Sequence, residues 1–448
     1  MIGKRLRESS GRQVFGWAMY DWANSAYVTT VVVAVLPAYF ASTVVPKGGV
    51  EVLGTTLSAS SIWGYVVGLS ALLVFIMAPV LGAVADYSAT KKKFLALLCA
   101  MGSLCTVSLF FVGRGDVFLA MLLFGLAQIG LVGGNVFYDA FLPQIAPEGK
   151  MDWVSGKGFA LGYLGGGIQF ALSLGLIVLH DSFGISQELA ARLAMAAAGL
   201  WWGGFALITF KLLDEQPPVE EPVRKQGLAK VAAFTRIGFR GTARTFRTIG
   251  ADRNLLLFLL AFFLYNDGIQ TVINMATIYG KEELGFSMTV LMVTLLIIQA
   301  VAFGGALAFG KLAELVGAKP ALLLTLVLWT GVTVYAYFMT SPLEYFVLGV
   351  LVGLVLGGSQ SISRSFFGAM IPVQSPAEFY AFYSVVSKMS SILGPVMFAV
   401  VRQVTGTSRL SVLFQGLFFL AGLVLLSLVR PVRAGESDTR IMNEQAHG

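Results

Sequence analysis

Charged residues are scarce in this chain: Asp, Glu, Lys and Arg make up 12% of its 448 residues, whereas 56% are hydrophobic. Soluble domains usually carry about 25% charged residues. The chain therefore has too few charges to cover the surface of a soluble protein of this length. A soluble enzyme is excluded, and the long apolar runs, each near the roughly 20 residues that a spanning helix needs, predict an integral membrane protein.

Residues for metal and redox chemistry are equally scarce. The only cysteines, Cys99 and Cys105, share one apolar run, and the only histidines are His180 and His447. The sequence contains no metal-binding helix motif, no nucleophile elbow and no nucleotide-binding loop. We therefore expect no enzyme activity, no cofactor and no metal site, and any active transport must draw on an ion or solute gradient.

Twelve apolar segments predict an all-α membrane fold with twelve transmembrane helices. Of the 31 Lys and Arg residues, 24 lie in the termini and the even-numbered connections, whereas 6 lie in the odd-numbered connections. This bias places both termini in the cytoplasm, and we expect a bacterial inner or plasma membrane. The net charge of +7 then reflects topology, with no nucleic-acid partner. The predicted spans are 17–41, 61–83, 94–113, 117–139, 158–180, 191–212, 255–279, 289–310, 319–339, 343–366, 380–402 and 410–430.

The basic segment 213–253 separates two groups of six spans. We therefore expect an N-terminal bundle at 1–212, this cytoplasmic linker, a C-terminal bundle at 254–430 and a polar tail at 431–448. Within the linker, apolar residues recur at helical spacing beside a row of arginines, which favours a helix in the headgroup region of the inner leaflet. A solvated linker whose charges only enforce topology is the alternative. The residues of this pattern are Leu228, Val231, Phe234, Ile237, Arg236, Arg240, Arg244 and Arg247.

The two halves share landmarks at nearly constant spacing. Gly82 and Asp86 after the second span correspond to Gly310 and Glu314 after the eighth, 228 residues later. The prolines at 143 and 147 correspond to those at 372 and 376. These pairs predict two parallel six-helix repeats with a cavity between them.

The loop after the second span resembles the signature of the major facilitator superfamily. Gly82, Asp86, Lys91 and Lys92 fit it, whereas Tyr87 replaces a usual basic residue and Ala89 a usual glycine. A narrower resemblance joins the chain to the vacuolar-effluxer-like branch, which includes autophagy-related amino-acid effluxers of fungi and bacterial permeases. This resemblance implies the major facilitator fold and favours amino acids as substrates. The stretches that carry it are 16–26, 137–143, 158–167, 358–365 and 379–383.

Ionisable groups at membrane depth are costly and therefore mark candidate sites. In the first span, Asp21 either lines a cavity or caps a helix end at the interface. Asp267 lies deep in the seventh span, where it is a candidate protonation site or an interhelical lock, and Gln270 and Asn274 are expected on its helical face. Lys388 is the only lysine inside a span, and it could pair with Asp267 or Asp21 or meet a substrate carboxylate. Further polar residues assigned to the solute or proton pathway are Asn24, Tyr138, Tyr265, Asn266 and Gln360.

A second set of residues lies at the cytoplasmic span ends and predicts an inner gate. Asp139 and Arg364 occupy corresponding ends of the fourth and tenth spans and are expected to pair. The other predicted gate residues are Gly82, Asp86, Lys91, Lys92 and Glu314. Glycines of the fifth span, at positions 162, 165, 166 and 167, are expected to allow close helix approach.

Together these features predict a secondary active transporter, a monomer that moves a small polar metabolite by alternating access and with proton coupling. A receptor or scaffold of the same fold is one alternative, although it would not need a polar intramembrane set. An exporter of lipids or hydrophobic drugs is another, and it would need a more apolar cavity.

Overall fold

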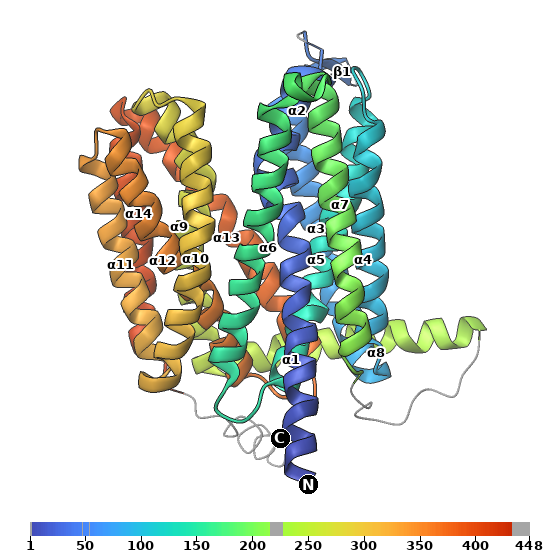
Figure 1. The fold of residues 1–448 in the computed structure, drawn as a ribbon. Helices are drawn as coiled ribbons and strands as arrows, with labels where there is room; N and C mark the ends of the chain where they lie inside the picture. Colours follow the sequence, from blue (N-terminus) through green and yellow to red (C-terminus); the bar gives the residue numbers. More distant parts are fainter. Residues whose placement is uncertain (1, 47, 53, 216–226, 432–448) are drawn as a thin grey trace. The chain divides into compact units, whose positions relative to one another are not determined.

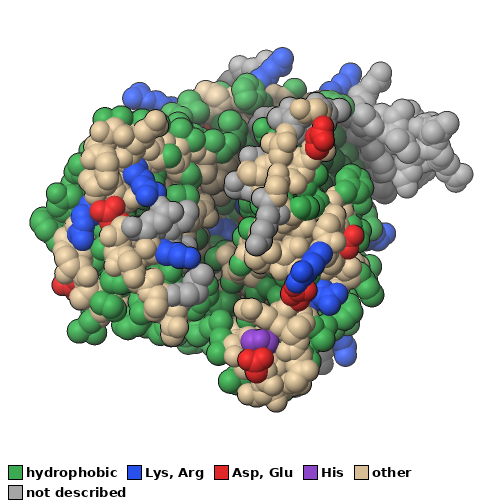
Figure 2. Space-filling view, turned by 90° about the horizontal axis from the view of Figure 1, so that it is seen from above, with side chains coloured by type: hydrophobic (Ala, Val, Ile, Leu, Met, Phe, Trp, Pro, Cys, Tyr) green, Lys and Arg blue, Asp and Glu red, His purple; other side chains and the backbone are tan. Residues whose placement is uncertain are grey.

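The computed structural model describes residues 2–46, 48–52, 54–215 and 227–431. Among these residues, twelve helical segments are long and apolar enough to cross a membrane, as predicted. They are Gly11–Val44, Ile62–Ser88, Lys91–Phe111, Val117–Ile145, Met151–Val178, Gln187–Leu212, Arg253–Ala276, Thr289–Val316, Ala318–Phe338, Pro342–Met370, Pro376–Thr405 and Ser408–Leu428. Seen from above, hydrophobic side chains lie mostly around the margin of the visible face, and the charged side chains are few and scattered over it (Figure 2).

The helices follow the order in Figure 1. The first half contains α1 (Ile2–Ala26), α2 (Leu36–Tyr39), α3 (Ala59–Ser88), α4 (Lys91–Ser108), α5 (Val117–Ile145), α6 (Met151–Val178) and α7 (Gln187–Leu212). The second half contains α8 (Gly227–Ala251), α9 (Arg253–Ile278), α10 (Met288–Val316), α11 (Ala318–Phe338), α12 (Pro342–Met370), α13 (Pro376–Thr405) and α14 (Ser408–Leu428). Short π-type or 3-10 turns are Tyr27–Val35, Phe40–Val44, Leu109–Phe111, His180–Phe183 and Tyr279–Glu283.

Several helices begin at residues whose side chains cap the free backbone N–H groups of the first turn. Ser186, Ser287 and Thr407 cap α7, α10 and α14, and Asp252 accepts two backbone hydrogen bonds at the start of α9. Ser341 forms a capping box with Glu344 at the start of α12. These polar residues therefore set the helix boundaries between long apolar runs.

The chain divides into two compact units that do not follow the predicted boundary at residue 212. Unit 1 contains Met1–Ala78, Ala89–Tyr138 and Leu161–Pro217, whereas unit 2 contains Pro79–Ser88, Asp139–Ala160 and Pro218–Gly448. The division falls in α3 at Pro79 and in α5 four residues before Pro143, and proline weakens the helical hydrogen-bond ladder. The end of α3 and the α5–α6 connection thus pack with the second half of the chain.

The linker contains α8, which runs across the direction of the neighbouring spans (Figure 1). Its backbone is described from Gly227, and its side chains are described from Phe239 onward. The predicted apolar row and Arg236 lie outside the described side chains, and the predicted tail lies outside the described residues from 432 onward.

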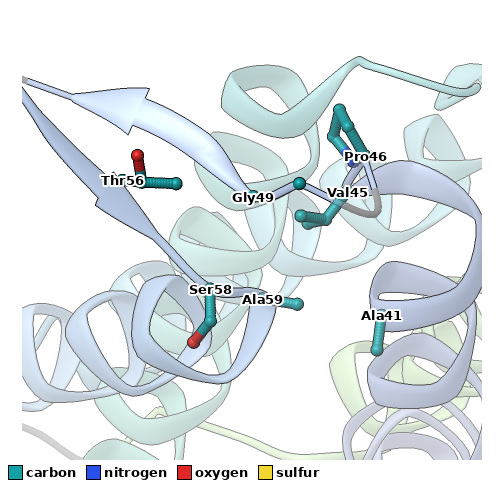
Figure 3. Close-up of a pocket in the computed structure, with 8 residues that line it drawn as sticks. Ala41, Val45, Pro46, Gly49, Thr56, Ser58 and Ala59 are labelled. Atoms are coloured by element: carbon teal, nitrogen blue, oxygen red, sulfur yellow. The ribbon is translucent and has the colours of Figure 1, made fainter.

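A hairpin that the sequence did not indicate connects the first two spans. Strand β1 (Val50–Val52) pairs antiparallel with β2 (Thr55–Leu57), with Val50 opposite Leu57. A pocket of about 300 Å³ lies beside it, lined by small or apolar side chains with no charged group (Figure 3). It offers no partner for an ionic solute. Its labelled residues are Ala41, Val45, Pro46, Gly49, Thr56, Ser58 and Ala59.

The internal repeat is visible in the helix bounds. Helices α5 and α12 each contain 29 residues, and Asp139 and Arg364 are each the twenty-third residue, 225 residues apart. The turns between the second and third spans of each half also correspond. Ala89 has a φ of 49° and its counterpart Gly317 has a φ of 96°, both in the region that favours glycine. The sequence departs from the superfamily pattern at Ala89, and the backbone there still adopts a conformation suited to glycine.

Candidate functional site

In unit 1, the polar cluster around Asp21 joins α1 to α5. The Tyr138 hydroxyl donates a hydrogen bond of 2.7 Å to Oδ2 of Asp21. The Tyr138 ring stacks on Trp17 at 4.6 Å, and the Trp17 indole donates to the Tyr138 carbonyl. Asn24 donates to Asn135 at 3.1 Å. Asp21 is thus part of a buried network, and Asn135 is a member that the sequence analysis missed.

The position of Asp21 in α1 tests the interpretation of this residue as a helix-end cap. Helix α1 begins at Ile2 and the apolar span at Gly11, so Asp21 lies about 15 Å along the span. A helix-end cap is therefore wrong for this residue, because the helix extends well before the predicted start at 17. Asp21 is half-buried and packs closely on α6, where a Cβ on Gly162 would lie 3.3 Å from the Asp21 Cβ and 2.9 Å from the Ser25 hydroxyl.

In unit 2, Asp267 of α9 contacts the backbone of α13. Its side chain is fully buried, and Oδ1 accepts a 2.9 Å hydrogen bond from the Gly394 N–H. Gly394 allows this approach, because a Cβ there would lie 2.7 Å from Oδ2 of Asp267. Oδ2 is buried without a hydrogen-bond partner among the described residues. Burying an ionised carboxylate with one oxygen that accepts no hydrogen bond has a large desolvation free energy, whereas burying the protonated form costs much less.

The polar residues beside Asp267 differ from one another in burial and in their contacts. Asn266 is buried and donates to the Ser390 hydroxyl at 2.7 Å, and the Tyr265 hydroxyl lies 2.7 Å from that of Ser363. Gln270 is half-buried and Asn274 is exposed. Asp267, Gln270 and Asn274 lie in one continuous α-helix, as their predicted common face requires, and the close contact with α13 is made by Asp267 and Thr271. Their joint role in a pathway stays a prediction.

Lys388 lies near the middle of α13, and Gln360 lies on α12. Lys388 is twelve residues from Pro376, which is about 18 Å along the helix. Its side chain is exposed, and among the described residues of unit 2 no ion pair links it to Asp267, which accepts a hydrogen bond from Gly394. The predicted pairing with Asp267 is thus not found, whereas pairing with Asp21, which belongs to unit 1, stays a prediction. Gln360 is half-buried.

The first predicted gate carboxylate, Asp86, binds the start of α13. Oδ2 of Asp86 accepts a 3.0 Å hydrogen bond from the backbone N–H of Glu378. A Cβ on Gly82 would lie 2.6 Å from the Ala377 carbonyl oxygen, so only glycine allows this approach. The buried Glu378 carboxylate in turn accepts a hydrogen bond from Thr245 of α8. We call Gly82, Asp86, Glu378 and Thr245 the α13 latch.

The second predicted gate carboxylate, Glu314, binds the start of α6. It forms ion pairs with Lys150 and Lys311, whose side chains are 51% and 54% exposed. A Cβ on Gly310 would lie 3.2 Å from the Asp152 carbonyl oxygen. We call Gly310, Glu314, Lys150 and Asp152 the α6 latch. The two latches use equivalent residues of the two repeats.

Arg364 connects the α6 side of this region to α5 and α12. It forms the expected ion pair with Asp139, at 3.1 Å, while its side chain is only 4% exposed. It also donates to both the hydroxyl and the carbonyl of Ser155 at 3.0 Å, and it stacks over Phe159. The Arg364 carbonyl accepts from Tyr380 of α13. The predicted pair is present, and its role in a gate remains a prediction.

Lys91 and Lys92 belong to unit 1, whereas the other predicted gate residues belong to unit 2. There the backbone N–H of Lys92 donates a 2.7 Å hydrogen bond to Glu215. Burial raises the pKa of the Glu215 carboxyl, although this hydrogen bond and the charges of Lys91 and Lys92 act in the opposite direction. Glu215, like Glu378 and Ser155, was missed because its partners are far away in the sequence.

Comparison with known families identifies the group to which the chain belongs. The family described as "Vacuole effluxer Atg22 like" matches residues 9–152 and 148–439. The chain belongs to this family. Among the described residues of this Atg22-like protein, no cluster of three or more His, Cys, Asp or Glu side chains could hold a metal ion.

Relatives in the family are transporters of the major facilitator type. The Atg22-like chain is 35% identical to the uncharacterized MFS-type transporter YxiO of Bacillus subtilis, over 97% of both chains. It is 24% identical to autophagy-related protein 22 of Coccidioides immitis, over 100% of this chain and 91% of the relative. The Atg22-like protein is therefore an integral membrane transporter of the major facilitator superfamily.

Solved structures agree with the fold of the Atg22-like protein. The proton:xylose symporter XylE superposes with a TM-score of 0.70 at 12% identity, over 98% of this chain and 99% of that one. The human organic anion transporter MFSD10 superposes with a TM-score of 0.67 at 17% identity, over 94% and 99%. The predicted fold class is thus confirmed, whereas identities this low say nothing about substrate.

Proposed function

We propose that this Atg22-like protein is a proton-coupled secondary transporter of a small polar metabolite, with amino acids as the first candidates. Alternating access would expose the solute site to one side of the membrane at a time. The effluxer description of the family supports solute movement. The resemblance to fungal amino-acid effluxers supports the choice of solute.

The burial and hydrogen bonding of Asp267 are the main support for the proposal of proton coupling. A fully buried carboxylate with one oxygen that lacks a hydrogen-bond partner gains or loses a proton according to the water that reaches it. The position about 21 Å along α9 puts this proton deep in the membrane. Hydrogen bonding to Gly394 also makes Asp267 an interhelical contact, so protonation and the packing of α9 on α13 are coupled.

Lys388 and Asp21 are the proposed solute-binding charges of their respective units. The exposed side chain of Lys388 carries an ammonium group that can bind a carboxylate of the solute, and few other cations lie within the spans. The half-buried carboxylate of Asp21, oriented by Tyr138, can accept an ammonium group. Each charge by itself favours a solute that carries the opposite charge over an uncharged sugar.

The α13 and α6 latches and the Arg364–Asp139 pair are the proposed inner gate. All lie in unit 2, where segments 79–88 and 139–160 contact helices of the second half. Breaking these contacts would free the first-half segments to move, as alternating access requires. The distribution of Lys and Arg supports a cytoplasmic location for this gate and for both termini.

Reconstitution of the full chain into proteoliposomes tests the proposal. We expect uptake or efflux of an amino acid that responds to an imposed pH gradient. Asp267→Asn should abolish the response to the pH gradient while solute exchange persists, because the amide oxygen can still accept the hydrogen bond from Gly394 but the side chain no longer titrates. Asp181→Asn, which changes a carboxylate that is 93% exposed, is the matched control and should behave as the parent protein.

Three results would contradict separate parts of the proposal. Proton-coupled movement that persists in Asp267→Asn would remove the role of Asp267. The absence of pH-linked movement for amino acids, sugars and peptides alike would remove proton coupling. Equal apparent affinity for amino acids in Lys388→Gln and Lys388→Arg would remove the role of Lys388.

A further inference from the structure

The linker helix α8 contacts the rest of unit 2 through one stripe of residues spaced four apart. Gly241, Thr245 and Ile249 are buried. A Cβ on Gly241 would lie 2.8 Å from the Ala83 side chain and 3.2 Å from the Glu378 carboxylate. Thr245 donates to that same carboxylate. The inner face of α8 is therefore seated on the end of α3 and on the first turn of α13.

The opposite side of α8 is basic and partly aromatic. Arg240, Arg244 and Arg247 are exposed, and Phe239 and Phe246 are 63% and 69% exposed. The helix, Gly227–Ala251, contains no Asp or Glu. Exposed arginines beside exposed aromatic rings on one helix are typical of a segment that lies among lipid headgroups.

The position of α8 matches the boundary of the bilayer. It ends at Ala251, and the span of α9 begins at Arg253, so α8 lies where the chain enters the membrane. Its partners Ala83 and Glu378 lie within the terminal turns of α3 and α13. The positive charge of Arg244 also acts electrostatically on the Glu378 carboxylate, so the charge of α8 favours the ionised form of this latch residue.

We propose that the arginines of α8 bind the headgroups of anionic phospholipids and that this binding stabilises the α13 latch through Thr245 and Glu378. Each arginine near an anionic surface contributes about 1 kcal/mol. Since Glu378 is held by Thr245 on its side chain and by Asp86 on its backbone N–H, ordering α8 orders the start of α13. The consequence for transport rests on the proposed gate, whereas the lipid contact itself does not.

Hydrogen exchange of the full chain in nanodiscs tests this coupling without any transported solute. Nanodiscs of phosphatidylcholine alone are compared with nanodiscs that also contain phosphatidylglycerol. We expect phosphatidylglycerol to slow exchange in 239–249 and in 376–383 by about fivefold or more, the factor that about 1 kcal/mol produces. In Thr245→Val, the slowing should remain in 239–249 and disappear in 376–383.

Substitutions of the arginines separate charge from other effects. The triple variant R240Q/R244Q/R247Q should lose the response to phosphatidylglycerol in both segments, whereas R240K/R244K/R247K should keep it and thereby show that the helix still folds. Lys281→Gln, outside α8, should respond as the parent protein. Equal exchange in both kinds of nanodisc, or a response that survives in the glutamine triple variant, would overturn the proposal. Slowing in 376–383 that survives Thr245→Val would overturn its route through Thr245.

Discussion

The two latches use the same positions of an internal repeat and different chemistry. In the α13 latch, Asp86 accepts a backbone N–H from the first turn of a helix, and both partners are buried. In the α6 latch, Glu314 is held by two lysines whose side chains are about half exposed. Both latches therefore contain a glycine and a carboxylate at equivalent positions of the repeat. The α13 latch contains a hydrogen bond to a buried backbone N–H, whereas the α6 latch contains ion pairs with exposed lysines.

This difference predicts different responses to mutation, salt and backbone change. Buried hydrogen bonds to charged groups contribute about 1.5–3 kcal/mol, whereas ion pairs with exposed partners contribute about 0–1 kcal/mol and are screened by salt. The predictions below use matched substitutions in the two repeats.

The largest effect is expected from Arg364, whose network borders the α6 latch. Arg364→Gln removes the partner of the half-buried Asp139 and two hydrogen bonds to Ser155. Loss of one partner from a buried pair costs about 3 kcal/mol, so the thermal unfolding midpoint should fall markedly. The double variant D139N/R364Q should recover part of the loss. An unchanged midpoint in Arg364→Gln would show that the network contributes no stability.

Alanine substitutions at the two latch glycines should have unequal effects. Gly82→Ala places a Cβ 2.6 Å from a backbone oxygen and should destabilise the α13 latch by about 1–3 kcal/mol. Gly310→Ala places it 3.2 Å away, so a small shift relieves the contact and a smaller loss is expected. Hydrogen exchange in 376–383 and 151–158 measures each latch separately. Equal losses of stability in Gly82→Ala and Gly310→Ala would contradict the inference that the α13 latch is more tightly packed than the α6 latch.

The turns at Ala89 and Gly317, which follow the carboxylates of the two latches, can be tested by exchanging alanine and glycine between them. Gly317→Ala should destabilise the protein by about 1–3 kcal/mol, because its backbone, at φ 96° and ψ 152°, suits glycine. Ala89→Gly should stabilise it by up to about 1 kcal/mol by relieving the positive φ of 49°. Thermal unfolding of both variants beside the parent tests this contrast, and a destabilised Ala89→Gly would contradict it.

The smallest expected effect is a difference between the two latches in how their hydrogen exchange depends on salt concentration. Glu314→Gln should speed hydrogen exchange in 151–158, and at low salt this change should correspond to a loss of about 1 kcal/mol or less in the free energy of local opening. The difference from the parent protein should shrink in high salt. Asp86→Ala should raise exchange in 376–383 by a factor that salt changes less, because it removes a hydrogen bond from a buried backbone N–H. A strong salt response in Asp86→Ala would show that long-range charge dominates at both latches.

Much of the candidate site could be predicted because polar residues are conspicuous in an apolar sequence. Asp267 and Asp21 are rare charges inside apolar spans, and Asp139 and Arg364 are rare charges near span ends; the structure buries Asp267 fully and pairs Arg364 with Asp139. Their partners were not predictable. Gly394, Ser155, Thr245 and Glu378 are ordinary residues in helical sequences, and their contacts depend on how distant helices pack.

The sequence by itself determined the twelve spans, the repeat and the superfamily, because apolar run length, landmark spacing and a short signature are local properties of the chain. Only the tertiary structure decided that Asp267 faces the backbone of α13 and that the end of α3 and the α5–α6 connection pack with the second half. These outcomes depend on close approaches between helices, which glycine positions permit but which periodicity along one helix does not reveal.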